Sequence, residues 1–237
     1  MRKVFCDFLC IIGIVMLCVS CNSLPIKGSG ELVTLEKSIS AFEKINCSST
    51  ADVRFYISDI YRTVVTVDSN LDEYVEISSE NNVLNIRAKR GQSYKFTKFI
   101  VEVYSPVLTG VSIAGSGSFN SVDKILTSTF TTDISGSGTI EGTVYSDDFF
   151  AKILGSGRIT IVGTCQDAKI SIAGSGTFSG NEFDIKNATV NISGSGTGNF
   201  CVSDGLNATI SGSGNINYRG EPKIDSSIAG SGKIRKM

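Results

Sequence analysis

Carboxylates are the side chains in this sequence with the most capacity for chemistry, because the chain contains no histidine. A Ser-His-Asp triad, a Cys-His pair, a His-ligated zinc site and a histidine pH switch are therefore all excluded. Glycosidases and polysaccharide lyases instead use clustered Asp or Glu residues in an open groove. The acidic candidates for such a groove are Asp133, Glu141, Asp147, Asp148, Asp167, Glu182 and Asp184.

Asp147 and Asp148 are adjacent in the sequence, between Ser146 and Phe149. Consecutive residues of a strand point to opposite faces, so in a strand these two carboxylates could not act together. In a loop they could bind a cation, but a solvated turn is the simpler interpretation. Lys152 and Lys169 are expected to face outward as solubilising charges. We therefore predict no catalytic, cofactor-binding or metal-binding residue, and a protein that is not an enzyme.

The cysteines likewise indicate no catalytic or metal-binding site. Of the seven, Cys18 and Cys21 form a C-x-x-C spacing, but they lie in a segment that we expect to be removed or acylated. Cys47, Cys165 and Cys201 remain, an odd number without metal-ligand spacing. We interpret them as small buried hydrophobic residues, and whether two of them form a disulfide stays open.

The N-terminus has the layout of a secretory signal, with Arg2 and Lys3 before an apolar run. This run ends in Leu17-Cys18-Val19-Ser20-Cys21, which resembles a bacterial lipoprotein signal. The resemblance implies lipidation at Cys21 and a lipid anchor in the outer membrane. We expect a signal peptide over residues 1–20 and a tether over residues 21–34. No acidic residue directly follows Cys21 as an export signal, so the periplasmic or surface side stays open.

The second half of the chain is a repeat. Seven Gly-Ser-Gly triplets follow one another at intervals of 18 to 21 residues, about 19 on average. Ile always stands two positions before the triplet, and an apolar residue stands four positions after its first Gly in six of seven copies. Polar residues occupy most odd offsets, which is the period of a strand. The triplets begin at Gly115, Gly136, Gly155, Gly174, Gly194, Gly212 and Gly230.

This pattern predicts an all-β fold, a right-handed parallel β-helix (β-solenoid), because one coil cannot bury its apolar face without a stacked neighbour. The glycines fall on the inward parity, where two walls approach or a strand bends, and the Ser between them points outward. Residues 35–105 are strand-rich, with strands expected at 52–57, 62–67, 83–87 and 99–104. No linker separates them from the repeats, so we expect a single domain over residues 35–237, with the repeats in residues 106–237.

The order of these motifs resembles one family. Its features here are Ile39-Ser40-Ala41-Phe42-Glu43-Lys44-Ile45, Val65-Thr66-Val67-Asp68-Ser69-Asn70-Leu71, Val83-Leu84-Asn85-Ile86, Val101-Glu102-Val103-Tyr104-Ser105-Pro106-Val107-Leu108 and the triplets that follow. Together they resemble the head GIN domain family of putative auto-transporter adhesins, common in Bacteroidetes and largely of unknown function. The resemblance implies a right-handed β-helical fold and an envelope-anchored protein, and it brings no catalytic residues.

The sequence therefore favours a lipid-anchored, non-enzymatic envelope protein with an adhesin-like or scaffold surface. The alternative is a carbohydrate-active β-helix enzyme of the polysaccharide lyase or glycosidase type. Expected partners are the membrane, through the anchor, and glycan or protein ligands. The net charge of −1 gives no basic surface for nucleic acid. The terminal coil from Ile224 to Ile234 would expose strand edges, which predicts a homo-oligomer.

Overall fold

The computed structural model describes residues 24–237. The predicted signal peptide and the predicted lipidation site Cys21 lie outside these described residues. Within them the fold is almost entirely β, as the repeat predicts, and no helix is long and apolar enough to cross a membrane. A short 3-10 helix, η1 (Asp72–Tyr74), is the exception to the strands in this part of the chain.

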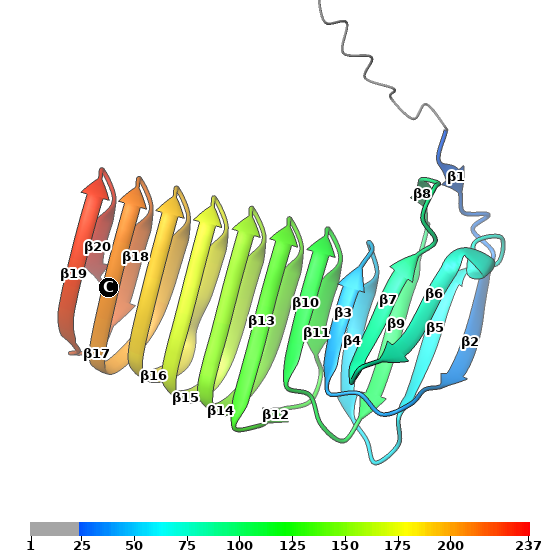
Figure 1. Cartoon of the computed structure of the whole chain (residues 1–237), viewed down its shortest axis with the longest axis horizontal. Coiled ribbons are helices and arrows are strands. Elements are labelled where there is room, and N and C mark those ends of the chain that lie inside the picture. The colour runs from blue at the N-terminus through cyan, green and yellow to red at the C-terminus, as the bar shows by residue number, and fades with distance from the viewer. Residues whose placement is uncertain (1–23) are drawn as a thin grey trace, which may run out of the picture.

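The strands are numbered along the chain (Figure 1). They are β1 (Ile26–Lys27), β2 (Leu32–Ser38), β3 (Lys44–Ser48), β4 (Asp52–Ile57), β5 (Arg62–Asp68), β6 (Val75–Glu80), β7 (Val83–Ala88), β8 (Tyr94–Lys95), β9 (Phe99–Ser105), β10 (Gly110–Gly115), β11 (Ser118–Ser121), β12 (Ile125–Leu126), β13 (Thr129–Gly136), β14 (Thr139–Gly155), β15 (Arg158–Gly174), β16 (Thr177–Gly194), β17 (Thr197–Gly212), β18 (Asn215–Arg219), β19 (Lys223–Gly230) and β20 (Lys233–Lys236).

Two walls of strands face each other across the core, as Figure 1 shows. Wall A contains β6, β7, β3, β10, β13, the second halves of β14 to β17, and β19. Wall B contains β2, β5, β9, β4, β11, the first halves of β14 to β17, and then β18 and β20. Pairing is parallel through both walls except where β2, β5, β6 and their partners are antiparallel. The chain therefore winds as a β-solenoid, which confirms the predicted fold class.

The Gly-Ser-Gly triplets form the bend from wall A to wall B, and both glycines are required there. Gly174 has a φ of +117°, and a Cβ on it would lie 2.5 Å from the carbonyl oxygen of Gly155 in the preceding coil. A Cβ on Gly176 would collide with Cγ2 of Ile153. The exposed Ser175 between them donates its backbone N–H to Gly155 O at 2.9 Å. The triplet thus lets successive coils approach closely while its serine faces solvent.

The core follows the same register. The Ile residues that precede the triplets are buried from Ile113 to Ile210, and each lies beside its counterpart in the next coil. One coil departs from the pattern at Gly198, which pairs with Phe178. The missing side chain leaves room for Phe200, whose ring stacks on Phe178 at 5.3 Å between centroids. An exchange of ring and glycine between neighbouring positions therefore keeps the core filled.

The N-terminal end is closed by antiparallel pairing and by a buried carboxylate. Asp68, at the end of β5, accepts hydrogen bonds from the backbone N–H groups of Gly30 and Thr97 at 2.9 and 2.8 Å and from the Thr97 hydroxyl. Burial alone would raise the pKa of Asp68, but these hydrogen bonds outweigh it and lower the pKa. In the segment predicted as a tether, residues 26–27 pair with β8, and residues 32–34 belong to β2.

At the other end of the described chain the solenoid is open. Every residue of β19 is exposed, including the inward-facing Ile224 and Ile228 at 39% and 44%. Their counterparts one coil earlier, Leu206 and Ile210, are fully buried. The edge of β19 therefore presents apolar side chains and unpaired backbone groups together.

Candidate functional site

The outer face of wall B carries an open polar cleft of about 510 Å³. It is built by alternation along β4: Val53 and Phe55 point into the core and are fully buried, so Asp52, Arg54 and Tyr56 point outward. The neighbouring strands β11 and β14 complete the cleft. They contribute Ser118, Asn120, Thr139 and Glu141.

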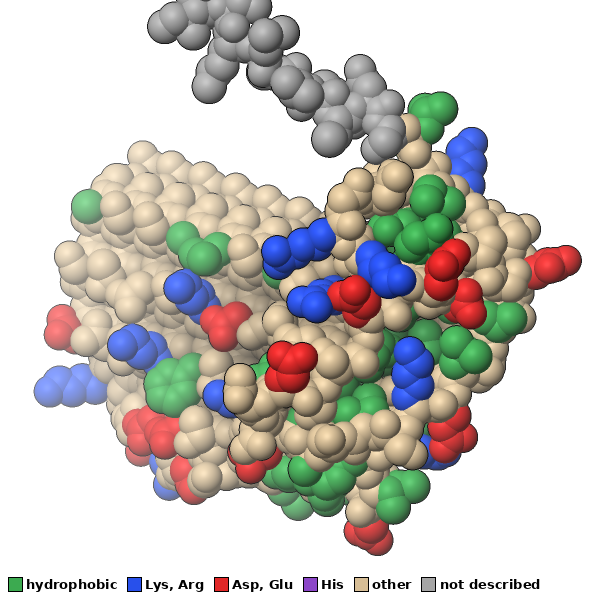
Figure 2. Space-filling model, turned by 45° about the vertical axis from the view of Figure 1, so that its right-hand side comes forward, with side chains coloured by type: hydrophobic (Ala, Val, Ile, Leu, Met, Phe, Trp, Pro, Cys, Tyr) green, Lys and Arg blue, Asp and Glu red, His purple; other side chains and the backbone are tan. Residues whose placement is uncertain are grey.

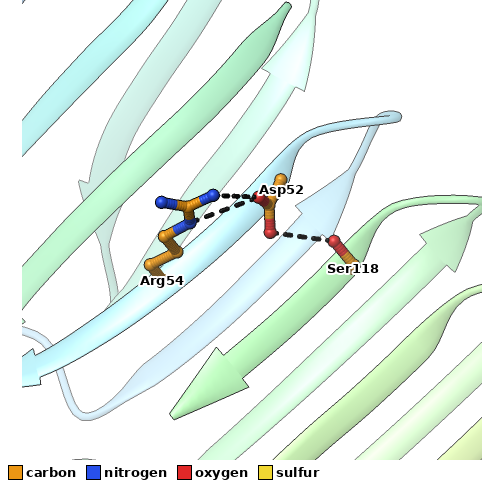
Figure 3. A network of polar contacts seen from close by, with 3 residues as sticks. All are labelled: Asp52, Arg54 and Ser118. Carbon is orange, nitrogen blue, oxygen red and sulfur yellow. Dashed lines mark hydrogen bonds and ion pairs between the residues drawn. The ribbon is translucent and has the colours of Figure 1, made fainter. Parts of the chain in front are cut away.

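A network of polar contacts fixes the carboxylate of Asp52 in this cleft (Figure 3). Arg54 donates from Nε and Nη2 to Oδ2 of Asp52, at 3.2 and 3.0 Å. The Ser118 hydroxyl donates to the other carboxylate oxygen, Oδ1, at 3.0 Å. Asp52 is thus held from two strands while its side chain remains 39% exposed to solvent. Such a group is positioned before any ligand arrives.

Next to the network stands a column of stacked side chains. The rings of Tyr56 and Tyr104 lie 5.0 Å apart and nearly parallel, at 13°. The guanidinium of Arg62 lies over the Tyr104 ring, 4.2 Å from its centroid. The Tyr104 hydroxyl donates to Glu102, and burial together with that carboxylate raises the pKa of Tyr104.

The acidic residues singled out in the sequence are distributed around the solenoid, and Glu141 alone among them lines this cleft. Asp133 faces outward on wall A, where burial raises its pKa against the opposing effect of Lys152 and Lys44. On the face that Figure 2 displays, acidic and basic side chains are interspersed rather than gathered in one groove.

The remaining acidic candidates lie along the edge opposite the triplets. Asp148 and Asp167 are register partners there, and Asp167 accepts a hydrogen bond from Asn187 at 3.2 Å. Asp184 is instead the register partner of Cys201. Glu182 pairs with Val162 on β15. Among residues 24–237, no three His, Cys, Asp or Glu side chains form a group that could hold a metal ion.

An apolar pocket of about 360 Å³ opens on this same edge. Ile185 and Val202 line it together with Cys165 and Cys201, and Asp184 belongs to its polar part. Both cysteines are free, as is Cys47. Cys165 is on β15 and Cys201 is on β17, with β16 between them. Two strand spacings place their Cα atoms roughly 9–10 Å apart, which is too far for a disulfide.

The cysteine thiols are poorly suited to chemistry. Burial, with contributions from Asp167 and Asp148, raises the pKa of Cys165 to about 12. Burial and the Asp184 carboxylate also raise the pKa of Cys201. A thiol with a raised pKa is a weak nucleophile at neutral pH.

Sequence reasoning predicted the strand at 52–57 but gave no role to Asp52, Arg54 and Tyr56. A signal was present, since three side chains able to bind a ligand share one face of a strand whose other face is apolar. The contribution of Ser118 could not be anticipated, because it comes from a strand 66 residues further along the chain.

Comparison with known proteins identifies the family of this chain. The family model described as "Putative auto-transporter adhesin, head GIN domain" matches residues 41–222. The chain belongs to this family. The resemblance seen in the sequence is thereby confirmed, and the description of this family suggests a protein of the cell envelope or surface.

Solved structures of similar proteins agree with this assignment. A putative adhesin from Parabacteroides merdae is 26% identical, with a TM-score of 0.74 over 90% of this chain and 98% of its own. A protein from Parabacteroides distasonis described as a putative lipid binding protein is 28% identical, with a TM-score of 0.75 over 90% and 100%. A putative adhesin from Bacteroides fragilis is 21% identical and has a TM-score of 0.85 over 90% and 100%, which supports the fold. No curated protein matches the chain.

Proposed function

We propose that the protein is a lipid-anchored, non-enzymatic protein of the bacterial outer membrane that presents an adhesin-like or scaffold surface to a glycan or protein ligand. The observation that carries this proposal is the cleft on wall B, in a chain that belongs to a family of adhesins. Asp52 and Tyr56 offer a carboxylate, held in place by Arg54, and an aromatic ring on a rigid sheet, which suits recognition.

The binding part of the proposal is tested by a screen. The purified protein is immobilised and exposed to a panel of host and bacterial glycans and envelope proteins. We expect at least one ligand whose binding is lost when Asp52 is replaced by Ala and kept when Asn191, exposed on the outer face of wall A, is replaced by Ala. Binding that is lost with Asn191→Ala and kept with Asp52→Ala would place the ligand on the wrong wall.

The anchor is tested separately. Cys21 ends the apolar run of the signal, and its thiol is the group that would carry the lipid. We expect the wild-type protein to partition into detergent with the outer-membrane fraction and the Cys21→Ala variant to lose acylation, as measured by mass spectrometry. Protease treatment of intact cells then distinguishes the surface from the periplasmic side.

The same cleft also supports the enzymatic alternative, because two carboxylates, Asp52 and Glu141, line it. Glycosidases use such a pair as acid and base or as acid and nucleophile. The Asp52 carboxylate, however, already accepts hydrogen bonds from Arg54 and from Ser118, an arrangement that suits a fixed acceptor for a ligand. Whether a bound glycan is released intact decides between the two functions.

A second binding function is supported by the apolar pocket beside Cys165. The neighbour from Parabacteroides distasonis is described as a putative lipid binding protein, and this pocket is lined mainly by apolar surface with Lys186 and Asp184 among its polar residues. We propose that an acyl chain could occupy it. Binding of a fluorescent fatty acid is measured for the wild-type protein, Val202→Asp and Tyr56→Ala. Binding that is weakened by Val202→Asp and unaffected by Tyr56→Ala would support this function. Equal binding to all three proteins would refute it.

A further inference from the structure

We propose that the wall B cleft binds a neutral pyranose sugar, with the C–H face of the sugar on Tyr56 and its hydroxyl groups on Asp52, Asn120 and Glu141. This inference rests on the proposed function and names the class of its ligand.

The geometry of Tyr56 is the first step. Strands β5, β9 and β4 are neighbours in that order, and they carry Arg62, Tyr104 and Tyr56 in register. Arg62 and Tyr56 thus cover opposite faces of the Tyr104 ring. The second face of Tyr56 turns toward β11, where the cleft opens and Val122 is 50% exposed.

A ring held in this way is ready to stack. Its orientation is fixed by Tyr104 behind it, so little conformational freedom is lost when a ligand binds. The face of an aromatic ring carries partial negative charge, and the C–H groups on one face of a pyranose carry partial positive charge. The two surfaces are therefore complementary in shape and in charge.

The polar residues of the cleft match sugar hydroxyl groups. Asp52 is an acceptor fixed by Arg54 and Ser118. Asn120 lies in register between Arg54 on β4 and Glu141 on β14, so its amide offers both a donor and an acceptor in the middle of the cleft. The volume of about 510 Å³ lies within the range of small-ligand sites, roughly 300–1,000 Å³.

The charges select among sugars. Two carboxylates, Asp52 and Glu141, line the cleft against one guanidinium, Arg54. Arg54 already donates from two of its nitrogens to Asp52, and Glu102 is its register partner on the other side. An acidic sugar would meet net negative charge without a free cation, so a neutral sugar is favoured.

Isothermal titration tests this inference with two sets of oligosaccharides on the wild-type protein. One set consists of neutral oligosaccharides of glucose, galactose, mannose and N-acetylglucosamine, and the other of uronic-acid and sialic-acid oligosaccharides. We expect binding within the neutral set, and at least about tenfold weaker binding of the acidic set. Preference for acidic sugars, or no binding to either set, would overturn the inference.

Variants locate the sugar. Tyr56→Ala is expected to weaken binding by about tenfold, whereas Tyr56→Phe, which keeps the ring, changes it by less than about twofold. Phe150→Ala, which removes an exposed ring on the outer face of wall A, serves as the aromatic control. Equal loss with Tyr56→Phe and Tyr56→Ala would refute stacking. A protein ligand found in the screen, lost with Asp52→Ala but accompanied by no sugar binding, would overturn this inference and leave the proposed function in place.

Discussion

Replacing Gly174 by Ala tests why the repeat keeps glycine at its bends. The residue has a φ of +117°, which an L side chain rarely adopts, so alanine costs about 1–3 kcal/mol in backbone strain. Its Cβ would also lie 2.5 Å from Gly155 O, and the coils must separate to relieve that contact. Separation stretches the hydrogen bonds from Ser175 N to Gly155 O and from Thr177 N to Gly157 O, both 2.9 Å, worth about 1 kcal/mol each.

The expected loss is therefore about 3–5 kcal/mol in the free energy of unfolding. Urea denaturation followed by circular dichroism measures it. Gly91 provides a matched control, because it has a φ of +96° and a Cβ added to it would meet no atom within 4 Å, so Gly91→Ala isolates the backbone cost at about 1–3 kcal/mol. Ser175→Ala, on an exposed side chain, should change stability by less than about 0.5 kcal/mol. If Gly174→Ala is no more destabilising than Gly91→Ala, close stacking of the coils is not what requires glycine.

Three further outcomes are expected. The fold lowers the pKa of Asp68, so the stability that this carboxylate provides is present above its unfolded pKa of about 3.9 and is lost as the pH falls through the folded pKa. Asp68→Asn should therefore lower the urea midpoint at pH 7. The difference from the wild-type midpoint should narrow in acid. Alkylation under native conditions followed by mass spectrometry should find Cys47 and Cys165 unreacted and Cys201 partly modified. All three should react after denaturation. A disulfide-linked peptide between any two of them would contradict the observed pairing of the strands. We propose that two copies associate through the exposed β19 edge, so sedimentation velocity should show a concentration-dependent dimer that is lost with Ile228→Lys, and a strict monomer at all concentrations would exclude it.

The repeats could be predicted from the sequence because each coil restates the same period-two pattern. Ile153 and Gly155, for example, align with Ile172 and Gly174 both in the sequence and in the paired strands. Seven copies of one pattern leave a single register that turns every one of these Ile residues inward, so local pattern and fold agree.

The N-terminal part was harder to predict, because its strands pair across long stretches of chain. Strand β2 pairs antiparallel with β5, placing Val33 beside Val67, and nothing in the residues around Val33 identifies that partner. Strand β6, with Val75 and Ile77 on its inner face, carries too few apolar residues to be distinguished from a turn. Tertiary packing, rather than local propensity, defines these strands.

The candidate site escaped prediction for a related reason. The acidic candidates in the sequence all lie in the repeats, yet the cleft combines Asp52 and Tyr56 from the N-terminal part with Glu141 from the first repeats. Only the parallel pairing of β4 with β11 brings these groups to one face. The stacking of Tyr104 behind Tyr56 depends on a third strand, β9, that arrives later in the chain.

Recovery of the bound glycan measures whether this solenoid binds without turnover. The protein is incubated with the glycan that binds most tightly in the screen, and chain length and new reducing ends are measured over many hours. We expect the glycan to be recovered at full length and its retention to depend on Tyr56. Shortened products that accumulate with the wild-type protein, and are abolished by Glu141→Gln while binding persists, would contradict it.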